Sequence, residues 1–313
     1  MAAVSAAMVL SLGLAACGGS DEPGGDGDTS VSGEIVVDGS STVEPLTSAA
    51  GELFGEENSK VNVSVATSGT GGGFEKFCAG ETDISDASRP IKDEEAAICE
   101  TAGIEYTELR VATDALTVVV SKDNDFITCL TLDELKKVWE PAAEGKVTTW
   151  DQVNSAFPKE KIDLYGPGTD SGTFDYFTDE VNGEEGASRS DYNASEDDNV
   201  IVKGVGGSAN ALGYFGYTYF EENASTLKAV EVDSGDGCVA PSAETSADGT
   251  YTPLARPLFI YVKNASYADK PEVAAFVDFF VASDAEIAEV AQFIPLNDEQ
   301  RTELETALAT LKG

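Results

Sequence analysis

Strand-like apolar runs alternate with helix-favouring stretches along most of this chain, and this alternation limits the fold more than any other feature. The clearest strand-like runs are residues 35–37, 61–66, 115–120, 162–165 and 258–262. The helix-favouring stretches are residues 43–54, 74–78, 132–139, 174–181, 272–281 and 298–311. Such alternation predicts an α/β fold with a mostly parallel sheet. Residues 233–250, rich in Gly, Ser and Asp, are expected to form a long surface loop.

Three of the strand-like runs lead into short segments rich in Gly, Ser and Thr. These are DGSSTVEP at 38–45, TSGTGGGF at 67–74 and GTDSGTF at 168–174. In the first, Thr42 is expected to be the N-cap, and Pro45 fits the first helical turn, where its missing N–H is not needed. Each segment therefore predicts a helix start directly after a strand.

These helix starts suit an anion. The first turn of a helix has N–H groups without helical partners and carries a partial positive charge of about half an electron. Glycines let the backbone approach a ligand closely, and hydroxyl groups add further donors. One such segment alone favours an ordinary capped helix, but three in one chain favour an anion site built from oriented donors.

The charge balance restricts the partners. The formal net charge is -38, from 57 acidic and 19 basic residues. Such a surface repels nucleic acid and anionic membranes, so we expect neither as a partner. An anion site must then act at short range, which is feasible because physiological salt screens charges beyond about 8 Å. The chain contains no histidine, which removes the commonest general base and metal ligand. We expect no metal and no cofactor.

The N-terminal residues read as an export signal. Residues 1–17 are small and mostly apolar and end in LAAC, which resembles a bacterial lipobox with Cys17 as the lipid-modified residue. The alternative is an ordinary secretory signal with a chance cysteine. Residues 18–32 read as a flexible acidic tether. We therefore expect an extracytoplasmic protein, held to the outer face of the cell membrane by its lipid anchor alone.

Four cysteines remain after Cys17, an even number in an exported chain, so two disulfides are expected. Three connectivities are possible. We favour Cys78–Cys99 with Cys129–Cys238, because the first pair closes a short local loop. Metal binding by these cysteines is disfavoured because no C-x-x-C spacing or histidine accompanies them.

The three segments, together with DISDASRP at 83–90, resemble the phosphate-binding subunit of bacterial high-affinity phosphate ABC importers over residues 33–313. The resemblance implies a two-domain, periplasmic-binding-protein-like (Venus flytrap, class II) fold with two hinge crossovers. Domain one would comprise residues 33–114 and 256–313, and domain two residues 115–255. It further implies a monomer that buries inorganic phosphate between the domains and delivers it to a membrane permease.

The resemblance also implies which residues contact phosphate. These are Thr42 and Val43 in the first segment, Thr70 in the second, and Ser171, Gly172 and Thr173 in the third. We add Ser41 and Ser88, which lie beside them in the same motifs.

This chain departs from the family at two positions of the site. Relatives have aspartate at Ser88 and arginine at Pro167. We expect Arg89 to supply the cationic contact instead; the alternative is that it pairs with a surface carboxylate. At neutral pH phosphate carries a proton that sulfate lacks, and a carboxylate can accept it. Asp114, before the run 115–120, is the predicted acceptor.

Asp86 and Asp170 are the alternatives to Asp114 as acceptor of the phosphate proton.

Functions other than phosphate binding are also compatible with parts of the sequence. Another tetrahedral oxyanion (sulfate, arsenate or phosphite) would suit the same donors. An exported phosphoester hydrolase could use Ser41 or Ser171 as nucleophile, but the chain lacks histidine and a recognisable metal cluster. We therefore expect a binding protein and no enzyme.

Overall fold

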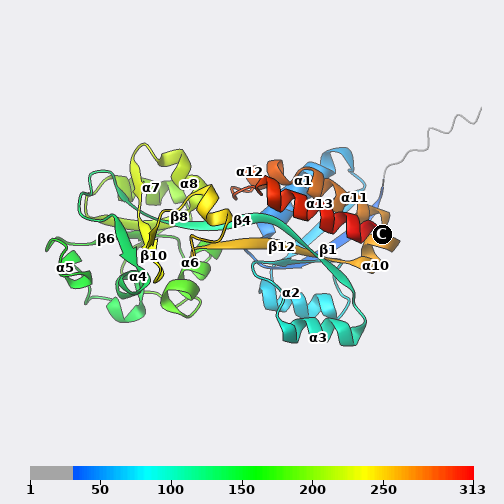
Figure 1. Ribbon diagram of the computed structural model, residues 1–313, viewed down its shortest axis with the longest axis horizontal. Coiled ribbons are helices and arrows are strands. Elements are labelled where there is room, and N and C mark those ends of the chain that lie inside the picture. Colours follow the sequence, from blue (N-terminus) through cyan, green and yellow to red (C-terminus); the bar gives the residue numbers. More distant parts are fainter. Residues whose placement is uncertain (1–30) are drawn as a thin grey trace, which may run out of the picture. The chain divides into compact units, whose positions relative to one another are not determined.

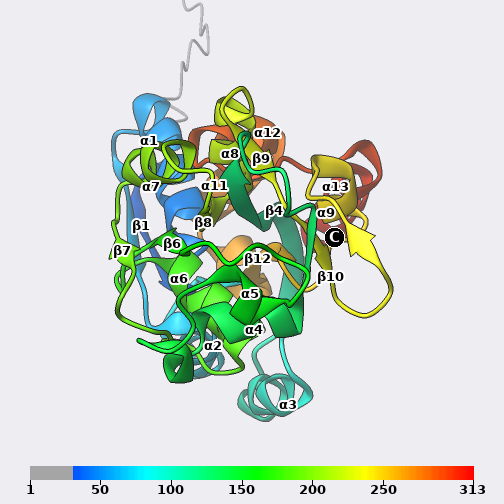
Figure 2. The same cartoon turned by 90° about the vertical axis from the view of Figure 1, so that its left-hand side faces the viewer.

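The structure is a computed structural model that describes residues 31–313. The predicted signal peptide, Cys17 and the tether up to residue 30 lie outside the described residues. A mixed sheet forms the centre, with helices packed on it (Figures 1 and 2). Within residues 31–313 no helix has both the length and the apolar character that crossing a bilayer requires.

The central sheet has the strand order β2-β1-β3-β12-β4-β8-β6-β7, and β9 pairs with β4 beside this path. Its strands are β1 (Gly33–Gly39), β2 (Val61–Ala66), β3 (Ile84–Ala87), β4 (Tyr106–Ser121), β6 (Asp163–Gly166), β7 (Asn193–Ala194), β8 (Ala211–Gly216), β9 (Leu227–Ala229) and β12 (Ala255–Lys263). A separate small sheet joins β5 (Cys129–Thr131), β10 (Glu231–Asp233) and β11 (Cys238–Val239) in the order β11-β10-β5.

The helices form two groups, the first of which comes from both ends of the described chain. The first group is α1 (Glu44–Glu57), α2 (Gly69–Cys78), α3 (Asp93–Ala102), α10 (Asn264–Asp269), α11 (Pro271–Ala282), α12 (Asp284–Val290) and α13 (Asp298–Lys312). The second group is α4 (Leu132–Trp139), α5 (Trp150–Val153), α6 (Gly172–Phe177), α7 (Asp198–Gly206), α8 (Tyr217–Asn223) and α9 (Ala243–Ala247). In Figure 1, β4 and β12 run side by side from the first group to the second.

The prediction of a mostly parallel sheet is wrong. Pairs on either side are parallel, as in β2-β1-β3 and β8-β6-β7. In the middle, however, β12 is antiparallel to β3 and β4, and β4 is antiparallel to β8 and β9. The reason is that β4 carries the chain from one half of the sheet to the other and β12 brings it back, so the two run in opposite directions.

The strand β4 changes partner along its length. Residues 106–115 pair with β12, whereas residues 116–120 pair with β8. The core clusters follow the same division. One large cluster draws its buried residues from 35–112 and 258–308, and the other from 116–254. We call the parts around these two clusters the first and the second half; the predicted domain boundaries stay a prediction.

Two local expectations are corrected. The helix expected at 74–78 begins at Gly69. It packs closely on β1, since a Cβ on Gly73 would lie 2.5 Å from the Cα of Gly39. The long loop expected at 233–250 contains β11 and α9, which is capped by the Ser242 hydroxyl. The helix at 132–139 and the strand at 61–66 have the predicted bounds.

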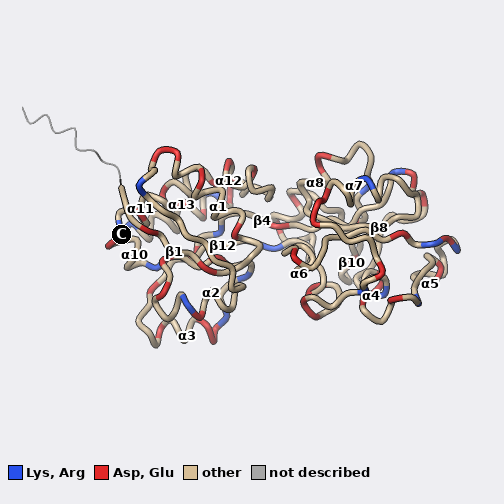
Figure 3. Tube along the Cα trace, turned by 180° about the vertical axis from the view of Figure 1, so that it is seen from behind, with Lys and Arg blue, Asp and Glu red and all other residues tan. Residues whose placement is uncertain are grey.

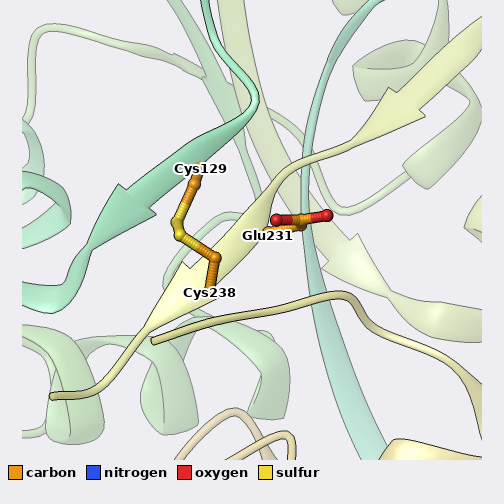
Figure 4. A group of neighbouring side chains, drawn as sticks. All are labelled: Cys129, Glu231 and Cys238. Carbon is orange, nitrogen blue, oxygen red and sulfur yellow. A yellow bond between two sulfur atoms is a disulfide. The ribbon is translucent and has the colours of Figure 1, made fainter. Parts of the chain in front are cut away.

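Both predicted disulfides are present. Cys78 is bonded to Cys99, and Cys129 to Cys238. The first joins α2 to α3, and the second joins β5 to β11 (Figure 4). Glu231 lies beside the second disulfide, but both sulfur atoms there are consumed by the covalent bond and supply no thiolate for a metal.

Candidate anion-binding site

The first segment turns from β1 into α1 through Ser40. The Ser40 N–H donates to the carbonyl of Asp86 (2.9 Å), and its carbonyl accepts from the N–H groups of Val43 and Glu44 (3.1 and 3.0 Å). The helix N-cap is Val43, so the prediction of Thr42 as N-cap is wrong. The Thr42 hydroxyl instead accepts a hydrogen bond from Arg256, which is distant in the sequence.

The second segment turns from β2 into α2 through Ser68. Both the N–H and the hydroxyl of Ser68 donate to Asp38 (2.9 and 2.6 Å), which fixes the turn against β1. Gly69 follows with φ +78°, a conformation that favours glycine. One residue on, the Thr70 hydroxyl lies 3.1 Å from that of Ser88 and accepts from the Ser88 N–H (3.2 Å).

The third segment starts α6. Ser171 is the N-cap, and its hydroxyl accepts from the N–H of Thr173 (3.2 Å). Gly172 lies against the first segment, because a Cβ at this position would be 3.2 Å from the Thr42 hydroxyl oxygen. Helix starts from the two halves of the molecule are therefore in contact.

All three segments line one cleft of about 620 Å³. Its lining residues are Ser40, Ser41, Thr42, Ser68, Gly69, Thr70, Gly71, Ser88, Arg89, Pro90, Gly172, Asp175, Tyr176, Asp179, Glu180, Glu185, Arg256 and Pro257. The predicted contacts Ser41, Thr42, Thr70, Ser88, Arg89 and Gly172 are among them.

The other predicted contacts do not line this cleft. The side chain of Val43 is fully buried, and Ser171 caps α6 from beside the cleft. Asp114 and Thr173 line a smaller neighbouring cavity of about 140 Å³.

Arg89 reaches the cleft, but its charge is matched on the protein. Its two terminal nitrogens each donate to one oxygen of the Glu95 carboxylate at 2.8 Å. This bidentate pair is the strong form of an arginine–carboxylate contact, and Arg89 holds the pKa of Glu95 below its usual range. The structure therefore shows the alternative considered for Arg89, a pairing with a carboxylate, at the edge of the cleft.

A second arginine, Arg256 on β12, lies between the three segments. It is not among the residues predicted from the sequence. Its Nη2 donates to the Thr42 hydroxyl (2.8 Å), its Nε donates to Asp114 (3.2 Å), and its guanidinium lies 3.5 Å from the ring centroid of Tyr176. The Nη1 group makes no hydrogen bond within residues 31–313. The one signal in the sequence is that Arg256 stands at the second predicted crossover; the β12–β4 register that sets it opposite Asp114 comes from the structure.

The predicted proton acceptors lie away from the cleft. Burial raises the pKa of Asp114, and the neighbouring Arg256 partly offsets this. Asp86 is fully buried beneath α1; its carboxylate accepts from the Thr47 hydroxyl (2.9 Å), and burial raises its pKa to about 8. Asp170 is exposed and is not a lining residue.

Four other acids do line the cleft: Asp175, Asp179, Glu180 and Glu185, which we call the acidic wall. They come from α6 and the residues that follow it. Burial raises the pKa of Asp175, and the charge of Glu185 raises it further, while Arg256 lowers it. Acidic residues are also spread over the rest of the described chain, with few basic ones between them (Figure 3). The site therefore combines oriented donors and two arginines, one of which is paired with Glu95, with acids.

The geometry offers little for hydrolysis. The Ser171 hydroxyl caps a helix. Among the residues that line the described cleft, neither a lysine nor a histidine stands beside Ser41 to act as a base. The hydroxyl and N–H donors that line the cleft suit an anion.

Comparisons with known proteins place the chain in a family. Residues 24–284 match the model of the PBP superfamily domain. The chain is 47% identical to the protein SphX of Synechocystis sp. over 93% of its length and 84% of the relative. It is 41% identical to the phosphate-binding protein PstS of Staphylococcus saprophyticus over 98% of its length and 93% of the relative.

A solved structure agrees with these relatives. The crystal structure of "a possible phosphate binding protein" from Planctomyces limnophilus is 46% identical in sequence. It matches 91% of this chain and 100% of that chain with a TM-score of 0.85. The α/β fold, the match to the domain model and the identity to SphX and PstS together show that this chain belongs to the PBP superfamily of binding proteins.

Proposed function

We propose that this protein binds inorganic phosphate in the cleft, outside the cytoplasm, and delivers it to the membrane permease of an ABC importer. The observation that carries the proposal is the meeting of hydroxyl- and glycine-rich helix starts around Arg256 in one cleft. The names of its relatives, which include phosphate-binding PstS proteins, support phosphate as the ligand.

The donor set is sufficient in energy. A hydrogen bond to a charged group contributes about 1.5–3 kcal/mol net. Micromolar affinity requires about 8 kcal/mol in total. Contacts from Ser41, Thr42, Thr70, Gly172 and the free N–H groups of Arg256 would exceed this before the costs of ordering are subtracted. The same donors would hold other tetrahedral oxyanions, so the choice of phosphate needs a further feature.

Binding would involve bending at the two crossing strands. Since β4 and β12 connect the halves, a change in their twist moves α6 relative to α1 and opens the cleft. Release would follow docking on the permease. We further propose that the protein is a monomer, and that a lipid on Cys17 tethers it to the membrane after removal of the signal peptide.

Titration calorimetry on the purified protein, freed of ligand by denaturation and refolding, tests the function. We expect one equivalent of phosphate to bind and sulfate to bind far more weakly. A chromogenic phosphoester incubated with the same sample should not be turned over. Binding of sulfate or phosphite in preference to phosphate would contradict the proposal, and turnover of the ester would favour a hydrolase.

A further inference from the structure

The donors of the cleft do not by themselves distinguish phosphate from sulfate. Both anions present acceptor oxygens to hydroxyl and N–H groups, but at neutral pH only phosphate also carries an O–H hydrogen. A site that offers this hydrogen a carboxylate gains a hydrogen bond with phosphate and faces sulfate with an unpaired charge. The acceptor must therefore lie in the cleft, where neither Asp86, which is sealed beneath α1, nor Asp114, which is paired with Arg256, is placed.

Asp175 has the required position. It lies on α6 one turn after the N-cap, and its N–H donates to the Ser171 carbonyl (3.1 Å). Side chains on a helix lean towards its N-terminus, so the Asp175 carboxylate covers the turn that contains Gly172. Gly172 in that turn lies beside Thr42 of the first half. The ring of Tyr176, the residue after Asp175, lies 3.5 Å from the guanidinium of Arg256.

Asp175 also differs from the other acids of the wall. It is half-buried, whereas Asp179, Glu180 and Glu185 are exposed. Residues 31–313 provide no hydrogen bond to its carboxylate, so its acceptor oxygens remain available to a ligand. Asp179 lies beyond α6, in the π-helical segment Thr178–Asn182, and therefore further along the chain from Gly172, which lies beside Thr42.

We propose that Asp175 is a specificity-determining residue, which accepts the O–H hydrogen of phosphate held between the starts of α1 and α6 and Arg256. This rests on the proposed function. It explains why a carboxylate lines an anion site. A carboxylate weakens the binding of an anion by repulsion, unless a proton forms a hydrogen bond between the carboxylate and the anion.

Calorimetric titration with phosphate and with sulfate, for the wild type, Asp175→Asn and Asp179→Asn, tests the proposal. Both variants remove one negative charge from the acidic wall of the cleft. We expect Asp175→Asn to lower the ratio of phosphate to sulfate affinity by about 100-fold or more, through weaker phosphate and stronger sulfate binding. Asp179→Asn should change both affinities in the same direction and leave the ratio within about threefold.

An equal gain in affinity for both anions in Asp175→Asn would overturn the inference, since Asp175 would then act only by repulsion. A wild type that binds phosphate without preferring it to sulfate would overturn it as well. If the wild type binds no phosphate at all, the proposed function itself fails, and the inference with it. Circular dichroism confirms folding of each variant; Asp175→Ser, which also removes the carboxylate, replaces an Asn variant that does not fold.

Discussion

At the scale of single residues, Arg256 is the side chain that connects the parts of the site. Its guanidinium contacts Thr42 at the start of α1, Asp114 on β4 and the ring of Tyr176 on α6. These contacts fix the plane of the guanidinium before a ligand arrives, so little rotamer entropy is lost on binding. A lysine could match the charge, but it could neither stack on the ring nor donate in two directions from one plane.

Arg256→Lys should therefore weaken phosphate binding by about 10- to 100-fold, which corresponds to about 1.4–3 kcal/mol. Arg89→Lys is the matched control, because that arginine also lines the cleft but is paired with Glu95. It should change the affinity less than about threefold. Calorimetry on both variants provides the comparison, and a larger loss in Arg89→Lys would show that Arg89 is the cation of the site.

Asp86 gives a prediction about stability and pH. Burial raises its pKa from 3.8 to about 8, so between these values the folded chain holds a proton that the unfolded chain releases. The contribution of Asp86 to the free energy of unfolding is fully present below pH 3.8 and is lost as the pH rises through about 8. The free energy of unfolding should fall by at most about 1.4 kcal/mol per pH unit across this window.

Asp86→Asn should remove this slope, because the amide does not titrate and its oxygen can still accept from Thr47. Denaturant unfolding of both proteins at pH 5, 7 and 9 measures the effect. The difference in unfolding free energy, variant minus wild type, should become more favourable to the variant as the pH rises. Other carboxylates contribute equally to the unfolding free energies of both proteins, so their contributions cancel in the difference. A difference independent of pH would show that Asp86 does not titrate in this range.

At the scale of elements, the sequence predicted fewer than half of the helices and strands of the described residues. No predicted run corresponds to α3, α5, α7 to α10 and α12, or to β3, β5 and β7 to β11. The helix-favouring stretch at 132–139 and the strand-like run at 61–66 gave the observed bounds of α4 and β2. The glycines before Phe74 were not expected inside α2, because glycine is a weak helix former, and the packing of Gly73 against Gly39 becomes visible only in the structure. Arg256 could not be assigned to the site from local pattern, since it enters the site only through the pairing of β12 with β4.

The contact between α6 and the first half yields a prediction at this scale. Gly172→Ala would place a Cβ 3.2 Å from the Thr42 hydroxyl oxygen, tighter than an ordinary contact. The helix start must then shift by a few tenths of an ångström, and the donors of the two halves no longer converge. We expect about a 10-fold weaker affinity for phosphate.

The unfolding free energy of Gly172→Ala should stay within about 1 kcal/mol of the wild type, because the strain falls on the cleft and not on a core. Gly55→Ala on α1, where an added Cβ would meet nothing within 4 Å and which is not a lining residue of the cleft, is the control. Unchanged affinity in Gly172→Ala would mean that the cleft tolerates a wider separation of its helix starts.

At the scale of the whole molecule, a net charge of -38 opposes the approach of any anion. Added salt screens this field beyond about 8 Å at physiological ionic strength, but it acts much less on contacts inside the cleft. The association rate constant for phosphate should therefore rise with ionic strength, while the dissociation rate constant changes little. Stopped-flow fluorescence in sodium chloride and in sodium gluconate separates screening from competition by chloride. A falling association rate would show that the local field of Arg256 outweighs the surface charge.

The division of the core also sets an order of completion during synthesis. The cluster within residues 116–254 is contiguous, so every residue it needs has been made before β12 appears. The other cluster begins with Ile35 but needs Leu258 and helices up to Leu308 to close. The first half, whose strands are translated first, therefore completes its core last. Its strands β1 and β2 lack part of that core until nearly the whole chain has been translated.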